Sequence, residues 1–254
     1  RDHCVTGVQT CALPISEKGC MFAVISMNFF SHFFVDAEPQ NPSFNAALIA
    51  PDILRNFTPT QSKFHFDHFL KTTQKDQAQE NHRLNQFFRG CTQHIQRDKW
   101  FHQSSLFNEI YLSQRDNWQL NCPRIGIPRF WFSLHVMIEI MIDSYLINNN
   151  LEKLHIFYQT METEEETYRS ALECLGHTQI DVFMERYRRF YTNQYLFHYQ
   201  DLERVGFALH KIHELVKLDS SWYQPNHPDQ IQFWENTYAH ISVILEKHPF
   251  KTKV

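Results

Sequence analysis

Residues 130–147 read FWFSLHVMIEIMIDSYLI and form the most apolar stretch of the chain. Their apolar residues recur at intervals of three and four, which is the period of a helix. His135, Glu139 and Asp143 interrupt the stretch. Charges at the centre of a membrane span are costly, so the sequence predicts a helix in a protein core and no membrane span. A core helix that keeps three ionisable groups must satisfy them with a metal ion or with each other.

The helical period continues along the chain from Met27 onward, and no strand-like alternation extends beyond a few residues. Prolines separate the apolar runs, among them Pro123, and Thr178 with Asp181 forms a capping box before the seventh helix. We find no internal repeat and no shift in composition. The sequence therefore predicts an all-α fold, a single multi-helix bundle. The expected helices cover residues 28–37, 43–56, 76–99, 101–114, 127–149, 151–174, 179–192, 195–217 and 229–247.

Composition excludes several classes of protein. A chain of 254 residues can bury a sizeable core without disulfides. It has only 6 glycines and neither of the glycine-rich phosphate-binding motifs, which argues against glycine-cradled nucleotide sites. Its 24 Lys and Arg against 28 Asp and Glu give a net charge of −4, so we expect no nucleic-acid partner. The 16 histidines are the unusual feature.

The first 26 residues, RDHCVTGVQTCALPISEKGCMFAVIS, differ from the remainder and hold three of the six cysteines. Residues 5–16 resemble the translation of a sequencing adapter. We therefore interpret residues 1–26 as a non-native leader and residues 27–254 as a single helical domain. An alternative interpretation takes residues 21–35 as the apolar part of a secretory signal, but His32 interrupts that segment and no small-x-small cleavage site follows it.

The cysteines outside the leader indicate a reducing compartment. They are odd in number and include no C-x-x-C pair, so a disulfide framework is disfavoured and a cytoplasmic protein is expected. These cysteines are Cys91, Cys122 and Cys174.

Two stripes of metal-ligand residue types have a spacing of four, which places each stripe on one face of a helix. The first consists of His135, Glu139 and Asp143, and the second of His94, Asp98 and His102. His32 in FFSHFF and Asp52 in LIAPDIL each add one polar group to an apolar helix.

Mixed imidazole and carboxylate groups without thiolate suit Mn, Fe, Mg or Zn in a hydrolytic site with one or two metals. The implied reaction is hydrolysis of a phosphoester by metal-activated water. Simpler interpretations stay open: an internal polar ladder for residues 135–143, a solvated face for residues 94–102, and a hydrogen-bonded core residue for His32.

Other polar clusters have weaker patterns. His65, Asp67 and His68 form a possible local metal site. His210 and His213 are three residues apart on an amphipathic helix, where we expect a solvated face. The acidic run at residues 161–166 is also expected to be exposed.

Several sequence blocks resemble the bacterial acyl carrier protein phosphodiesterase family. They are MNFFSHFF, ALIAPDILRNF, the G-x3-H-x3-D-x3-H run that starts at Gly90, HVMIEIMIDSYL and YLFHYQDLERVGFALHKI. The resemblance spans roughly residues 27–217 and implies an HD-domain-like fold and a manganese-dependent hydrolase that removes the 4′-phosphopantetheine arm from a carrier-protein serine. The family usually has an acid where this chain has His102, and His-Phe where it has Ser144-Tyr145. No His is directly followed by Asp anywhere in the chain, so the His-Asp dipeptide typical of HD domains does not occur.

The resemblance implies roles for His32, Asp52, His94, Asp98 and Asp143, and we add a hypothesis for the remaining polar residues of the two stripes. Mn would be the cofactor, with Fe, Mg or Zn as alternatives. The expected metal ligands are His32, Asp52, His94, Asp98 and Asp143. The residues expected to bind a second ion or to orient the ligands are His102, His135 and Glu139. The candidate catalytic acids and bases are His32, His102 and Glu139.

The partner would be an acyl carrier protein or a small phosphodiester. Carrier proteins are acidic, so a docking surface should be basic, and Arg186, Arg188 and Arg189 in MERYRRF are the candidates. Such a triplet can equally be an ordinary solvated face. The rival functions are a zinc phospholipase-like hydrolase, an HD-like phosphohydrolase specific for nucleotides, and a non-catalytic helical binding protein with a relic site.

Overall fold

The computed structural model describes residues 28–57 and 82–248. Within these ranges the chain is helical and contains no strand, which confirms the predicted all-α, multi-helix fold. The expected leader at residues 1–26 and the cluster of His65, Asp67 and His68 lie outside the described residues.

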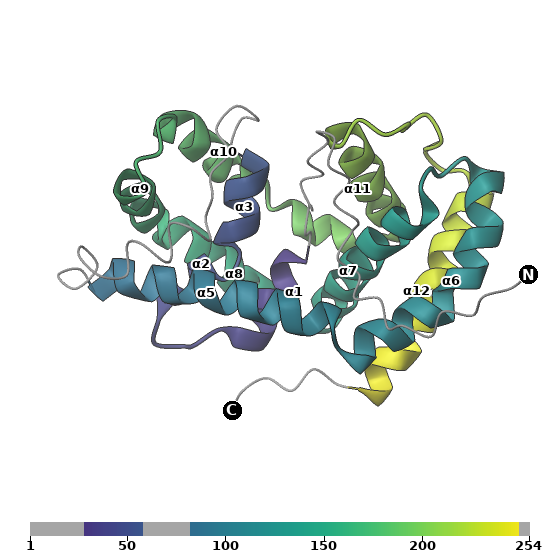
Figure 1. Ribbon diagram of the computed structural model, residues 1–254, viewed down its shortest axis with the longest axis horizontal. Coiled ribbons are helices and arrows are strands. Elements are labelled where there is room, and N and C mark those ends of the chain that lie inside the picture. The colour runs from purple at the N-terminus through teal and green to yellow at the C-terminus, as the bar shows by residue number, and fades with distance from the viewer. Residues whose placement is uncertain (1–27, 58–81, 249–254) are drawn as a thin grey trace, which may run out of the picture.

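Figure 1 shows the arrangement of the helices. In chain order they are α1 (Phe29–Asp36), α2 (Pro42–Ala47), α3 (Ala50–Phe57), α5 (His82–His102), α6 (Ser105–Ile125), α7 (Phe130–Asn149), α8 (Leu151–Thr163), α9 (Glu165–Cys174), α10 (Ile180–Asn193), the 3-10 helix η1 (Tyr195–Gln200), α11 (Leu202–Leu215) and α12 (Pro228–Lys247).

The apolar helix α7 lies at the centre of the described fold. It packs against α1, α6, α8, α11, α12 and η1 (Figure 1). By length and composition alone α7 could cross a membrane, but 72% of its apolar window is buried inside the protein. The prediction of a buried core helix is thus confirmed. The helices of the described ranges share one continuous core, rich in Phe, Tyr and Trp side chains.

A buried carboxylate lies where the predicted helix 151–174 is interrupted. Glu164 is 1% exposed, and its oxygens accept hydrogen bonds from Ser43 Oγ at 2.5 Å, Thr167 Oγ at 2.7 Å and Arg83 at 2.8 Å. It therefore joins α2 and α5 to the junction of α8 and α9. The expectation of an exposed acidic run is wrong at this position because the paired donors offset the cost of burying the charge.

Two helix-end predictions are also wrong. Pro123 lies inside α6, close to its end at Gly126, whose positive φ of 80° closes the helix. A proline near a helix end removes a single amide donor, and the helix can end soon after it. At α10 the N-cap is Gln179 without a side-chain cap bond, and its amide donates to His177 Nδ1, so Thr178 forms no capping box.

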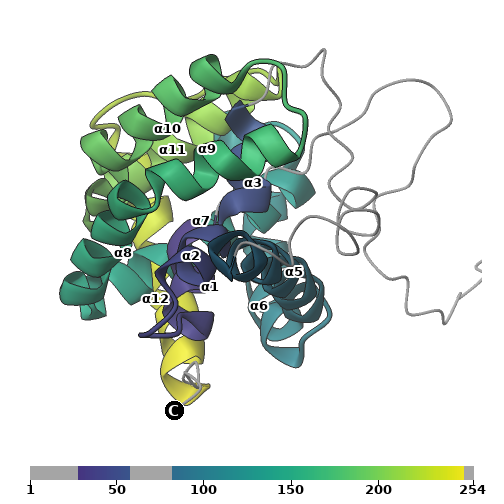
Figure 2. The ribbon, with the colours of Figure 1, turned by 90° about the vertical axis from the view of Figure 1, so that its left-hand side faces the viewer.

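Among the described helices, α2 and α5 share the most extensive contact. Figure 2 shows α5 nearly end-on, with α2 lying against it. Gly90 permits this approach, because a Cβ atom at that position would lie 2.3 Å from the carbonyl oxygen of Phe44 and 2.8 Å from the Cβ of Ala47. Only glycine fits there without moving α2.

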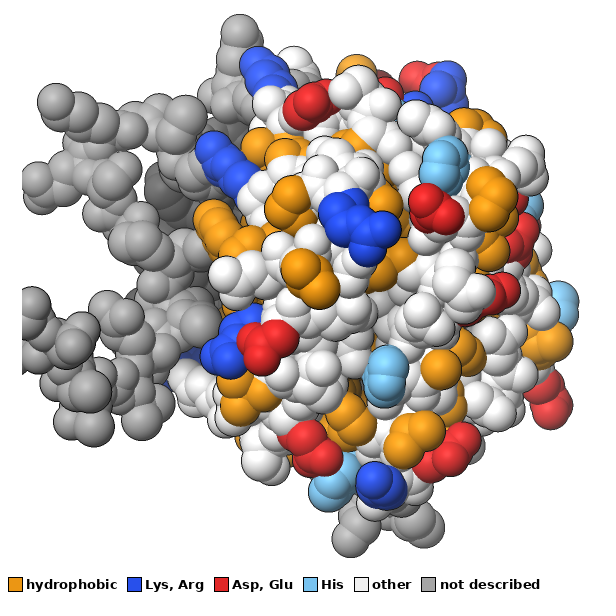
Figure 3. All heavy atoms as spheres, turned by 90° about the vertical axis from the view of Figure 1, so that its right-hand side faces the viewer, with side chains coloured by type: hydrophobic (Ala, Val, Ile, Leu, Met, Phe, Trp, Pro, Cys, Tyr) orange, Lys and Arg blue, Asp and Glu red, His pale blue; other side chains and the backbone are white. Residues whose placement is uncertain are grey.

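The side of the molecule formed by α6 and α12 carries a mixed surface. Figure 3 shows hydrophobic side chains scattered among polar ones and charges of both signs on this face. Leu120 on α6 and Val243 on α12 are among the exposed apolar residues, at 69% and 49% exposure. Isolated apolar residues of this kind are ordinary on protein surfaces.

His213 is fully buried, which contradicts the expected solvated face for His210 and His213. Its Nδ1 accepts a hydrogen bond from Trp222 Nε1 at 2.9 Å, so the proton of the neutral ring must lie on Nε2. That nitrogen is 2.9 Å from Ser133 Oγ, which itself donates to the Pro128 carbonyl at 2.7 Å. His213 therefore connects α7, α11 and the loop before α12, and it cannot act as a base toward Ser133.

We expect the protein to lose stability in acid through His213. Burial, with the nearby His210, lowers the pKa of His213 to about 4, whereas the unfolded chain titrates near ~6.5. Between these two pH values the unfolded state binds more protons than the folded state. The contribution of the neutral His213 to the free energy of unfolding is therefore fully present above about pH 6.5 and is lost as the pH falls to about 4. The expected loss is about 3 kcal/mol.

Urea denaturation at about pH 7 and about pH 4 measures this effect. His213→Gln should be less stable than the unmodified protein at neutral pH and should show a smaller drop in acid. The same change at the exposed His240 is the control and should leave the drop unchanged. An equal acid-induced loss in His213→Gln and the unmodified protein would contradict the assignment.

Candidate metal centre

Four helices from different parts of the chain supply the ligand-type side chains. His32 comes from α1, Asp52 from α3, and Glu139 with His135 from α7. The long helix α5 supplies His94 and His102. These side chains form two groups of three, each of which could hold a metal ion: His32, Asp52 and His94, and then His102, His135 and Glu139.

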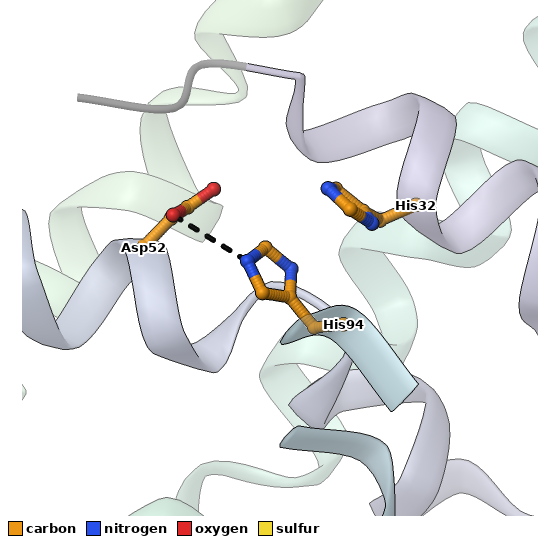
Figure 4. Close-up of side chains that lie close together, drawn as sticks. All are labelled: His32, Asp52 and His94. Atoms are coloured by element: carbon orange, nitrogen blue, oxygen red, sulfur yellow. Dashed lines mark ion pairs between the residues drawn. The ribbon is translucent and has the colours of Figure 1, made fainter. Parts of the chain in front are cut away.

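The first group is buried, and its members point toward one another from three helices (Figure 4). One ligand atom of each residue lies within 4.8 Å of the others. His94 Nε2 is 3.5 Å from Asp52 Oδ1, and the rings of His32 and His94 have their centroids 4.1 Å apart. Two N or O ligands of one ion are at most about 4.4 Å apart, so small side-chain rotations would close this group around a cation.

Polar atoms of the first group lack hydrogen bonds. Neither ring nitrogen of His32 and neither carboxylate oxygen of Asp52 has a hydrogen-bond partner among the described residues. His32 is 2% exposed and Asp52 is 1% exposed. The contact of 3.5 Å to His94 is too long to be a good hydrogen bond. Buried polar groups without partners are rare and costly, and a cation is a partner that both side chains can share.

The backbone orients His94 for ligation. Its Nδ1 lies 2.8 Å from the carbonyl oxygen of Leu48, so this nitrogen carries a proton and donates it to the carbonyl. The free electron pair is then on Nε2, which faces Asp52. Histidines that bind metals commonly have this second hydrogen bond. Leu48 is a part of the site that the sequence did not predict, because a backbone carbonyl leaves no signal in residue identity.

The second group is more open than the first. The side chains of His102 and His135 are 22% and 29% exposed, whereas Glu139 is buried. Glu139 Oε1 lies 3.3 Å from His102 Nε2 and 3.1 Å from His135 Nε2, and the two rings stack with centroids 4.7 Å apart. One carboxylate oxygen thus faces two imidazole nitrogens at the edge of the core.

Asp98 connects the two groups. Its Oδ1 is 3.1 Å from His102 Nε2. Burial raises the pKa of Asp98, but the hydrogen bond and charge of His102, together with the charges of His32 and His94, lower it to about 2. The carboxylate is therefore ionised at neutral pH and interacts electrostatically with histidines of both groups.

The histidines of the two groups differ in basicity. Burial and then the charge of His94 hold the pKa of His32 well below its usual value, so this ring is neutral and ready to bind a cation. Burial also lowers the pKa of His94, but the nearby charge of Asp52, together with the charge of Asp98 and the hydrogen bond to Leu48, outweighs it and the net shift is upward. Burial likewise lowers the pKa of His102, and Asp98 and Glu139 reverse that shift.

Asp143, an expected ligand, belongs to neither group. Its carboxylate accepts hydrogen bonds from the backbone amides of Phe30 at 2.9 Å and Ser31 at 2.7 Å. It therefore caps α1, whose N-cap residue Asn28 makes no side-chain cap bond. Burial raises the pKa of Asp143 to about 8, against the effect of these two amides.

Helix geometry explains this displacement of Asp143. Eight residues separate it from His135, a rise of about 12 Å along the helix with a rotation of roughly 80°. The spacing of four therefore placed Glu139 beside His135 correctly but carried Asp143 beyond the site. The same rise along α5 separates His94 from His102 and assigns them to different groups.

The predicted basic patch is partly neutralised. Arg186, Arg188 and Arg189 are exposed on α10. Arg188 pairs with Glu165, and Arg189 pairs with Glu185 one turn earlier on the same helix. This surface therefore has less positive charge available for an acidic partner than the sequence indicates.

Comparisons of the chain with protein-family models, with curated proteins and with solved structures found no match. The function is therefore inferred from the sequence blocks and from the geometry of the two groups.

Proposed function

We propose that the protein is a metal-dependent hydrolase that cleaves phosphodiesters with two divalent cations, Mn first among them. The main support is the pair of buried side chains, His32 and Asp52, whose polar atoms have no hydrogen-bond partner among the residues that the structure describes. They lie beside His94 in the first group. The second group has the same kinds of ligand, and its member His102 lies on the same helix as His94, α5. Nitrogen and oxygen ligands without thiolate suit Mn, Fe, Mg or Zn.

The two groups would bind different cations, because one group is buried and the other is partly exposed. His32, Asp52 and His94 would hold the first cation in the interior, and His102, His135 and Glu139 the second near the surface. Divalent cations at such sites polarise a phosphoryl oxygen and lower the pKa of water. Asp98, ionised and 3.1 Å from His102, would orient that ring toward the cation.

The finer proposal for the substrate is the phosphodiester that joins a 4′-phosphopantetheine arm to a carrier-protein serine. It rests on the resemblance of the sequence blocks, most of all the run from Gly90 to His102. A small phosphodiester is the alternative substrate. The described cysteines Cys91 and Cys122 are buried free thiols, in keeping with the cytoplasm as the proposed location.

Metal content and turnover test the proposal together. We expect the purified protein to bind two Mn ions per chain. Mn added to the chelator-treated protein should restore hydrolysis of bis(p-nitrophenyl) phosphate. Mass spectrometry of the metals and the release of p-nitrophenol measure the two quantities. A protein without bound metal and without turnover in Mn, Fe, Mg or Zn would support the non-catalytic binding protein instead.

The carrier-protein substrate has its own measurement. Release of 4′-phosphopantetheine from holo acyl carrier protein should depend on the same Mn titration. Turnover of the small diester without this release would retain the hydrolase and reject the carrier protein as its substrate.

A further inference from the structure

A pocket of about 470 Å³ lies directly beside the first group of ligands. His32 belongs to both, since it is one of the three grouped side chains and also lines the pocket. The volume is typical of sites for small organic molecules. Any ester held at the first group would therefore have one substituent positioned to enter this pocket.

The walls of the pocket are mainly apolar. Val35, Phe101, Leu106 and Ile142 line it, and none of its described lining residues is acidic. Trp100, which is 52% exposed, also lines the pocket. An apolar substituent gains free energy by leaving water for such walls.

The basic residues of the pocket differ in how fully they are paired. Arg97 donates two hydrogen bonds to Asp36, at 2.8 Å and 2.6 Å, and His248 lies 3.2 Å from Glu109. Lys247 is exposed, and no ion pair joins it to another described residue. A lysine at the pocket attracts an anionic ester and repels a cationic one.

We propose that the pocket binds one apolar chain attached close to the phosphate of an anionic ester. This inference rests on the proposed phosphodiester hydrolysis at the adjacent group. It selects between the two substrates proposed above: a small phosphodiester with a single alkyl or aryl chain on the side of His32, and not the largely polar 4′-phosphopantetheine arm.

A series of p-nitrophenyl alkyl phosphates with methyl, propyl, pentyl and hexyl chains tests the proposal in the Mn-loaded protein. We expect kcat/KM to rise about threefold for each added methylene group, until the pocket is filled. Leu106→Trp, which fills the pocket, should flatten this series. Leu112→Trp is the matched control, since Leu112 lies on the same helix, is 48% exposed and does not line the pocket. It should leave the series unchanged.

Equal kcat/KM for all chain lengths would overturn the proposal, and so would a series that Leu106→Trp leaves as steep as before. Absence of hydrolysis for every ester would instead overturn the proposed function, and calorimetry then tests the pocket independently. Hexyl phosphate should bind about two-hundredfold more tightly than methyl phosphate, and equal affinities would reject the pocket. Lysophosphatidylglycerol, which has one long apolar chain, distinguishes a soluble ester from an aggregated lipid as the substrate. Turnover below its critical micelle concentration indicates a soluble ester, and turnover only above it indicates an aggregated lipid.

Discussion

Asp52→Asn is expected to reduce phosphodiester turnover about a thousandfold and the bound Mn from two ions to one per chain. A divalent cation contributes several kcal/mol to the stabilisation of the transition state, which corresponds to this factor. Asp52 is the single carboxylate of the buried group, so its loss removes the negative charge that would offset the first cation. The second group, on α5 and α7, keeps its own carboxylate in Glu139 and should still bind an ion.

Stability supplies a second readout for the same substitution. Mn at a hundredfold excess over its Kd should stabilise the unmodified protein by about 2.7 kcal/mol per site. For a chain of this size that raises the Tm by roughly 5–10 °C. Asp52→Asn should lose this gain at the first site. In the metal-free protein it should cost little stability, because the carboxylate that it replaces is buried without a hydrogen-bond partner among the described residues.

Glu164→Gln is the matched control, since Glu164 is equally buried but lies in neither ligand group. It should lower stability, because three donors surround that carboxylate. Its Mn content and turnover should stay those of the unmodified protein. If Asp52→Asn bound two Mn ions and cleaved the diester at the normal rate, the metal centre would have to be abandoned.

Gly90→Ala is expected to destabilise the protein by about 3 kcal/mol. In an ordinary helix interior this substitution is stabilising by about 1 kcal/mol, so the close approach of α2 reverses its sign. The added Cβ would lie 2.3 Å from the Phe44 carbonyl oxygen, and backbone atoms of α2 cannot rotate away as a side chain can. The two helices must therefore separate.

This separation should also weaken metal binding. Leu48 directly follows α2, and its carbonyl accepts the hydrogen bond from His94 Nδ1. Loss of a hydrogen bond that orients a metal ligand costs about tenfold to a hundredfold in affinity. Chemical denaturation measures the stability of Gly90→Ala, and calorimetry measures its affinity for Mn.

Gly206→Ala separates the two effects. A Cβ at Gly206 would lie 2.4 Å from Trp234 Nε1, so the substitution also overpacks the core, but it does so between α11 and α12. It should destabilise the protein without changing its affinity for Mn. An equal loss of affinity in both variants would show that Gly90 acts through general stability and not through His94.

The fold and most of the candidate site could be predicted because helical periodicity determines which residues share a face. The interval of four placed His135 with Glu139 and Asp98 with His102, and the structure confirms both contacts. Two successive intervals of four, as from His135 to Asp143, do not keep the end residues in one site, because the rise of the helix places them about 12 Å apart. For this reason Asp143 lies outside both ligand groups and caps α1 instead.

Predictions that depend on tertiary partners were less successful. The sequence predicts both Glu164 and His213 at the surface, the first because it lies in an acidic run and the second because it lies on an amphipathic helix. Both are buried because distant groups, Ser43 and Arg83 in one case and Ser133 in the other, supply their hydrogen bonds. No local pattern records such pairings, and the same holds for the Leu48 carbonyl behind His94.

The unsatisfied imidazole of His32 and carboxylate of Asp52 have a consequence for the protein in its cell. With an ion as the missing partner, the folded chain is favoured by a free energy that grows with the ion's concentration. Chains synthesised during metal starvation would unfold more often and be degraded sooner. The abundance of the protein, and not only its activity, would then follow the metal supply of the cell.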